Sequence, residues 1–354
     1  MLRGVASLAV LFWHWPHFFY RGTRPERVAA EKLPLHDFLY PLYQQGGLGV
    51  DIFFCLSGFI FYWLYADTVA GKAVSGRNFL VLRFSRLYPL HLVTLLAVAA
   101  GQDLYLRMTG GYFVYSHNDA YHFLLNLLFA PAWDFEAGFS FNAPVWSVSV
   151  EVALYAFFFA LCRLLPVRAP LLLGVAAAGL FVVEPHYLPL GRGIAAFFIG
   201  GTVYLAYRRI VASGHVAPLA RWLPWLLGVL WLFGLVALSL PAGVGPAWPN
   251  RMAHLYTTLV LFPLTILTLA VVETRRGPLM RGAAFLGDVS YSSYLLHFPL
   301  QLAAAGAAIA LGLDRSVFSS AWTLTAFIAI LLAVSFASHR FLELPAQRAL
   351  RRRG

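Results

Sequence analysis

Long apolar runs recur along the whole chain and constrain its fold more than any other feature. Ten of these runs could cross a hydrocarbon core of about 30 Å as helices, although residues 169–185 make a short one. The runs cover residues 2–20, 47–66, 87–106, 144–165, 169–185, 191–207, 222–240, 253–272, 290–312 and 317–339. A further apolar piece at 121–133 is too short to span. Because the chain is 60% hydrophobic and only 12% charged, we expect an all-α polytopic bundle of about ten transmembrane spans.

The basic residues indicate how such a bundle is oriented. The net charge is +11, and 18 of the 26 Lys and Arg residues fall on the side of the N-terminus in a ten-span arrangement. Cytoplasmic loops carry the excess of Lys and Arg, so both termini are predicted to be cytoplasmic. The basic residues lie at the ends of apolar runs rather than in one patch, so no nucleic-acid partner is expected. We expect a single transmembrane domain over residues 1–345 and a basic cytoplasmic tail at 346–354.

The first apolar run contains an arginine and a histidine, Arg3 and His14. In a helix, a side chain eleven residues later points to within about 20° of the first one and lies about 16.5 Å farther along the helix axis. The two side chains therefore share a face, with Arg3 at the membrane edge and His14 near mid-membrane. An ionisable group at that depth is expensive and marks a possible functional site. The alternative is a structural histidine that a neighbouring helix or a water satisfies.

Two acidic residues, Asp51 and Glu151, lie within the predicted spans. A buried carboxylate must be paired, solvated or protonated. Ser147 lies one turn before Glu151 and could hydrogen-bond to it. Two interpretations remain open. Asp51 and Glu151 could be structural partners of each other's helices, or one of them could orient His14, because a histidine base needs its second nitrogen held.

Two arginines, Arg83 and Arg86, are three residues apart at the predicted cytoplasmic edge. They fit either topology anchors that extend to lipid headgroups or a clamp for phosphate, to which the guanidinium fork is suited. Near the predicted cytoplasmic start of a later span, Tyr291 could be an interfacial aromatic residue, whereas His297 is a second polar candidate within the membrane.

Metal and disulfide chemistry are not expected. The two cysteines, Cys55 and Cys162, lie in apolar stretches and are interpreted as small buried hydrophobic residues. His117 and His122, in a long loop predicted to be external, could bind a metal ion, but the spacing offers no suitable third ligand.

Six motifs in a fixed order resemble the acyltransferase family 3 of integral membrane proteins, which O-acylate cell-surface polysaccharides, lipid-linked sugars and macrolides. The resemblance covers nearly the whole chain. Its motifs are Leu-Arg-Gly with the Arg3-x10-His14 spacing, Gly49-Val-Asp-Ile-Phe-Phe-Cys-Leu-Ser-Gly-Phe, Arg83-Phe-Ser-Arg-Leu-Tyr-Pro89, Trp146-Ser-Val-Ser-Val-Glu151, Gly287-Asp-Val-Ser-Tyr-Ser-Ser-Tyr-Leu-Leu-His297 and Glu343-Leu-Pro345.

The resemblance implies transfer of an acyl group, acetyl above all, from acyl-CoA to a hydroxyl of a sugar, a glycolipid or a polysaccharide. We expect Arg3, Arg83 and Arg86 to meet the phosphates of coenzyme A. His14 is the expected base, supported by Glu151 or Asp51. Weaker candidates for substrate binding are Trp146, Ser147, Tyr291 and His297.

The expected location is the inner (plasma) membrane, among membrane lipids. A transient acyl-histidine is an alternative to direct transfer. The rival function is a transporter or flippase that uses these polar groups as a substrate pathway.

Overall fold

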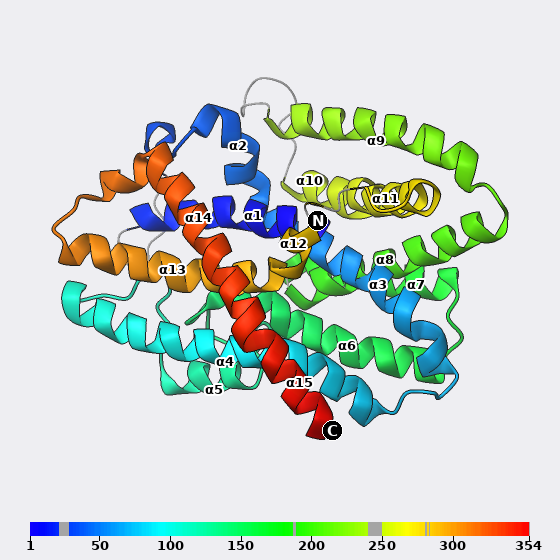
Figure 1. The fold of residues 1–354 in the computed structure, drawn as a ribbon, viewed down its shortest axis with the longest axis horizontal. Helices are drawn as coiled ribbons and strands as arrows, with labels where there is room; N and C mark the ends of the chain where they lie inside the picture. The colour runs from blue at the N-terminus through cyan, green and yellow to red at the C-terminus, as the bar shows by residue number, and fades with distance from the viewer. Residues whose placement is uncertain (21–27, 187–188, 240–249, 280–281, 283, 354) are drawn as a thin grey trace. The chain divides into compact units, whose positions relative to one another are not determined.

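The computed structural model describes residues 1–20, 28–186, 189–239, 250–279, 282 and 284–353, and helices dominate it (Figure 1). No strand occurs in these ranges, which confirms the expected all-α class. Within the same ranges, eight helices are long and apolar enough to cross a membrane. They are His36–Ala70, Gly76–Thr109, Ala143–Leu164, Pro189–Ala212, Val216–Ala237, His254–Arg276, Ser290–Ala310 and Ala321–Arg351.

Two of the ten predicted spans are not among these eight. One is the first run, where α1 (Leu2–His14) is followed by a 3₁₀ helix, η1 (Trp15–Phe19). Pro16 lies in the first turn of η1, where its missing N–H interrupts the α-helical hydrogen bonds. The same run carries Arg3, His14 and His17, which lower its mean hydropathy. The other is α7 (Ala169–His186), of which Ala169–Phe181 is described with its side chains and forms an apolar helical segment.

The contacts divide the chain into two compact units, and each unit combines segments that are distant in sequence. Unit 1 consists of Met1–Gly46, Gly76–Val150 and Phe285–Gly354, and unit 2 consists of Gly47–Ser75 and Glu151–Ala284. The larger helices of unit 1 are α1, α2 (His36–Gln45), α4 (Gly76–Thr109), α5 (Ala120–Leu127), α13 (Ser290–Ala310), α14 (Ala321–Ser338) and α15 (Leu344–Arg353). Its shorter helices are η2 (Ala30–Lys32), η4 (Ala143–Val145), α12 (Ala284–Asp288) and η7 (Arg315–Ser319).

Helix α13 is the centre of unit 1, with α1 on one side and α4 on the other (Figure 1). At the start of α1, a Cβ on Gly4 would lie 2.6 Å from both Cβ and the carbonyl oxygen of Leu286, so only glycine allows this approach. One turn later, the hydroxyls of Ser7 and Ser293 are 3.0 Å apart. Gly4 thus contacts Leu286 and Ser7 contacts Ser293, so the residue numbers rise together and α1 and α13 run in the same direction.

The C-terminal part of unit 1 is one continuous helical rod. A π-helical turn, η8 (His339–Glu343), joins α14 to α15 without a break. Glu343 is buried in this turn and accepts a hydrogen bond of 2.5 Å from Ser292, which ties the rod to α13. The predicted basic tail at 346–354 is helical through Arg353, and Gly354 lies outside the described residues.

Unit 2 contains η3 (Gly46–Leu48) at its edge, α3 (Gly49–Ala70), α6 (Trp146–Leu164) apart from its first residues, α7, α8 (Pro189–Ala212), α9 (Val216–Ser239), α10 (Asn250–Tyr256), a π-helical turn η5 (Thr257–Leu261) and α11 (Phe262–Arg276). Helices α3 and α8 touch through their backbones. A Cβ on Gly58 would lie 1.9 Å from the carbonyl oxygen of Phe197, and a Cβ on Gly200 would lie 1.9 Å from that of Cys55. Such glycine contacts are typical of close helix packing in membranes.

Candidate active site

Two histidines from opposite ends of the chain meet in unit 1. Nδ1 of His14, the last residue of α1, lies 2.9 Å from Nε2 of His297 on α13. Their ring centres are 5.0 Å apart and their planes are nearly parallel, differing by 8°. His297 is 1% exposed, whereas His14 keeps part of its surface open.

The hydrogen bonds assign the proton positions of this pair. Nδ1 of His297 lies 2.5 Å from the carbonyl oxygen of Tyr294. A carbonyl can only accept, so Nδ1 of His297 carries the proton and its Nε2 has the lone pair. Nδ1 of His14 must then donate to that lone pair. In the neutral ring this leaves Nε2 of His14 unprotonated and available as a base.

Several buried polar atoms lie around this pair without a hydrogen bond of normal geometry in the described ranges. Gln301 donates from Nε2 to the carbonyl of His14 at 3.0 Å, but its Oε1 has no such partner. The same holds for Nδ1 of His17, whose ring centre is 4.9 Å from that of His14. Asn142 donates to the carbonyl of Leu295 at 3.0 Å, and its Oδ1 is also unmatched. Because unmatched buried polar groups are costly, these atoms are suited to hold a polar substrate group.

The three arginines expected to meet the donor are all half-buried in unit 1. Arg3 is next to Gly4, which contacts Leu286 just before α13. Arg86 is next to Leu87, whose carbonyl accepts a hydrogen bond of 2.5 Å from the hydroxyl of Tyr291. Arg3 and Arg86 therefore belong to the same end of α13, and the histidine pair lies farther along that helix.

Helix α4 also presents Arg83, whose guanidinium lies 6.0 Å from the ring centre of Phe79. Between Arg83 and Arg86, the hydroxyl of Ser85 is 3.4 Å from Nε of Arg351 on α15. The sequence placed Arg351 only in a basic tail. The structure adds it to the arginine-rich turn of α4, and no local sequence signal could have shown this contact.

The candidates on α6 are partly tied to α13. Ser147 donates to the hydroxyl of Tyr294 at 2.8 Å, and Tyr294 donates to the carbonyl of Pro144 at 2.8 Å. Trp146 begins α6 and is half-buried. Glu151 belongs to unit 2, where it accepts a hydrogen bond of 2.9 Å from Ser57 on α3. The serine that contacts Glu151 is therefore Ser57 rather than the expected Ser147.

Asp51 forms an ion pair within unit 2. Its carboxylate receives Nε of Arg192 at 2.7 Å and Nη2 at 2.5 Å, and Nε2 of His254 is 3.2 Å away. Both oxygens of this fully buried group are thus engaged, which favours the structural interpretation of Asp51. Arg192 and His254 were not predicted as partners of Asp51. An arginine inside the predicted span 191–207 was the available signal in the sequence.

Comparison with known proteins connects this geometry to a reaction class. The acyltransferase domain family matches residues 1–340. The exopolysaccharide production protein ExoZ of Rhizobium meliloti (strain 1021) is 28% identical over 351 residues, covering 92% of this chain and 95% of the relative. Acyltransferase MdmB of Streptomyces mycarofaciens is 29% identical, covering 87% and 82%. A putative acetyltransferase, ORF330 of Acidianus two-tailed virus, is 25% identical, covering 85% and 82%. No solved structure matches the chain.

Proposed function

The chain belongs to acyltransferase family 3. It is therefore a multi-pass membrane enzyme that transfers acyl groups. We propose that its donor is acyl-CoA, acetyl-CoA in the first instance. The acceptor is a hydroxyl of a sugar in a polysaccharide or a lipid-linked glycan. The relative named for exopolysaccharide production supports a carbohydrate acceptor.

The observation that carries this proposal is the hydrogen-bond chain from the Tyr294 carbonyl through His297 to His14. It leaves the unprotonated Nε2 of His14 at a partly open position beside unmatched polar atoms. A base for hydroxyl activation needs this combination of a fixed lone pair and access to substrate.

In the proposed reaction, Nε2 of His14 removes the proton from the acceptor hydroxyl while its oxygen attacks the thioester carbonyl carbon. The new C–O bond forms as the C–S bond breaks. The imidazolium of His14 then returns the proton to the departing thiolate, so that the products are an ester and free coenzyme A. His297 acts as a positioning residue, because its Nε2 holds Nδ1–H of His14. A transient acyl group on His14 is the alternative route.

In this proposal the donor site is formed by arginines of α1 and α4. Arg3, Arg83 and Arg86 bind the phosphates of coenzyme A, since a guanidinium fork matches phosphate oxygens. Arg3 and His14 both lie on α1, eleven residues and about 16.5 Å of helical rise apart. The thioester end of the donor would thus reach along α1 toward His14.

The proposed topology follows from the charge distribution. Ten spans with both termini in the cytoplasm put the three arginines on the side where acyl-CoA is made, and the inner (plasma) membrane is the proposed location. Trp146, Ser147 and Tyr291 are proposed to bind substrate, and a catalytic role for Glu151 stays a prediction from the sequence. No metal ion takes part in this scheme.

Transfer of labelled acetyl groups tests the proposal. Purified protein is incubated with labelled acetyl-CoA and a panel of oligosaccharides, and both free coenzyme A and labelled sugar are measured. We expect turnover by the wild type and by His215→Ala, an exposed histidine of unit 2. His14→Ala should lose about 10²–10⁴-fold. Wild-type turnover by folded His14→Ala would refute the assignment. Label that stays on the wild-type protein in the absence of acceptor would favour the acyl-histidine route.

A further inference from the structure

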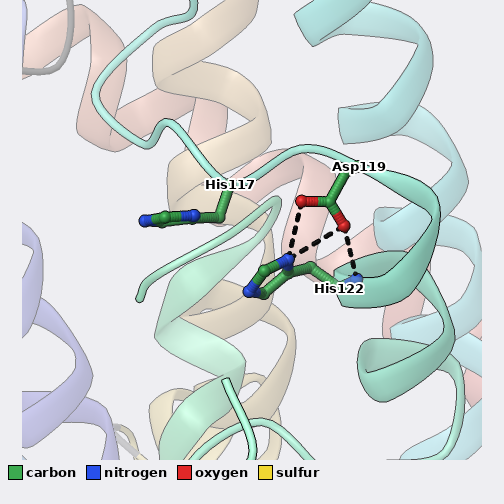
Figure 2. A group of neighbouring side chains, drawn as sticks. All are labelled: His117, Asp119 and His122. Carbon is green, nitrogen blue, oxygen red and sulfur yellow. Dashed lines mark hydrogen bonds and ion pairs between the residues drawn. The ribbon is translucent and has the colours of Figure 1, made fainter. Parts of the chain in front are cut away.

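Two histidines and an aspartate converge in the segment between α4 and α6 of unit 1, apart from the groups assigned to acyl transfer. One potential ligand atom from each of His117, Asp119 and His122 lies within 4.8 Å of the others. Figure 2 shows the Asp119 carboxylate hydrogen-bonded to His122, with the ring of His117 lying to their left. His122 is buried, His117 is half-buried and Asp119 is exposed, so the cluster is both fixed and open to solvent.

The backbone holds two of these side chains in place. Asp119 is the N-cap of α5, where its carboxylate accepts from the His122 amide at 2.9 Å. The same carboxylate lies 2.9 Å from Nδ1 of His122. One turn of helix therefore presents a carboxylate and an imidazole together.

A glycine makes room for the third side chain. A Cβ on Gly138 would lie 2.7 Å from Cδ2 and 2.8 Å from Nε2 of His117. Any side chain at position 138 would therefore move the His117 ring. The ring centres of His117 and His122 are 5.1 Å apart, so the two imidazoles are neighbours.

We propose that His117, Asp119 and His122 bind a divalent transition-metal ion, zinc in the first instance. Two imidazoles and one carboxylate suit zinc, whereas magnesium and calcium prefer oxygen ligands throughout. Three protein ligands leave a fourth, tetrahedral position for water. Ligand atoms around a tetrahedral zinc ion are about 3.4 Å apart for bonds of about 2.1 Å. The 2.9 Å separation of Asp119 and His122 therefore widens when the ion binds, whereas separations of up to 4.8 Å to His117 shorten. The site is independent of the acyl-transfer proposal.

Binding rearranges one hydrogen bond of His122. Its Nε2 accepts from the amide of Ala137 at 3.2 Å, so Nδ1 carries the proton that faces Asp119. For Nδ1 to bind zinc, that proton moves to Nε2 by exchange with solvent, and the Ala137 amide gives up its bond. Carboxylate and imidazole charges are otherwise unchanged.

Zinc titration of the intact protein tests the site. Protein in detergent is stripped with a chelator and titrated with Zn²⁺ by calorimetry and with Co²⁺ by visible absorption. Asp119→Asn keeps the helix cap, because asparagine is an equally good N-cap, but it removes the charged ligand. Asp314→Asn is the matched control, since Asp314 also caps a helix, through the Ser316 amide at 2.8 Å.

We expect one ion per chain in the wild type and in Asp314→Asn. Asp119→Asn should weaken binding by about 100-fold or more, because even residues that only support metal ligands contribute about 10–100-fold. Gly138→Ala should weaken it as well, whereas Gly111→Ala, which faces open space in the same segment, should not. The proposal is wrong if the folded wild type binds neither ion, or if Asp119→Asn and Gly138→Ala bind like the wild type.

Discussion

Replacing His297 tests how the protein prepares His14. In the structure, Nδ1 of His14 donates to Nε2 of His297 at 2.9 Å. His297→Ala removes the acceptor and frees the His14 ring to rotate and to move its proton to Nε2. Leaving a donor without its partner costs about 1–3 kcal/mol. At about 1.4 kcal/mol per factor of ten, we expect kcat to fall about 5- to 150-fold while the KM for acyl-CoA stays the same.

The assay is release of free coenzyme A from acetyl-CoA in the presence of a saccharide acceptor. His297→Gln should recover part of the rate, because its side-chain oxygen can accept from His14. Ser293→Ala is the control, since it removes a neighbouring contact of 3.0 Å between α1 and α13 and leaves the histidine pair intact. An unchanged kcat in His297→Ala, or an equal loss in Ser293→Ala, would refute the tautomer argument.

Three other perturbations distinguish the donor site from the structural contacts. Arg83→Ala should raise the KM for acyl-CoA about tenfold or more, since a charge-assisted contact contributes about 1.5–3 kcal/mol. Arg163→Ala in unit 2 should leave the KM unchanged, and equal KM values for the two variants would identify Arg83 as a topology anchor. Gly58→Ala should lower the melting temperature sharply, because its Cβ would lie 1.9 Å from a backbone oxygen. Gly174→Ala places its Cβ in open space and should leave the melting temperature unchanged. Equal melting temperatures of the two variants would contradict the close packing of α3 and α8. Asp51→Asn removes the buried charge that faces the half-buried Arg192 and should cost up to about 3–5 kcal/mol of unfolding free energy, measured by denaturant titration. A loss under about 1 kcal/mol would mean that the ion pair contributes little.

The helices were predictable because their cause is local. Each predicted apolar run coincides with helical segments in the described ranges, since a backbone in lipid must satisfy its own hydrogen bonds. The shared helix of Arg3 and His14 followed from spacing alone. The break after His14 could have been predicted from Pro16, which ends the α-helical hydrogen bonding.

The partners of the polar groups were not predictable in the same way. His297 is separated from His14 by 283 residues, and His254 from Asp51 by 203. Spacing along one helix gives no information about such pairs. Asp119, which we propose as a third metal ligand, was not predicted either, because the N-cap turn that brings its carboxylate to His122 is a feature of the folded chain. The roles of Glu151 and Trp146 remain predictions.

Because His14 and His297 are far apart along the chain, they are synthesised at different times during translation. Ribosomes add about 5–20 residues per second, so the separation of 283 positions between His14 and His297 takes about 14–57 s to synthesise. During that interval α1 exists without its partner helix α13, while the segments of unit 2 are synthesised. The proposed base therefore acquires its fixed proton arrangement only near the end of translation. Nascent chains that stop before α13 would carry His14 with its ring unheld, and in the proposed scheme they would lack acyl-transfer activity.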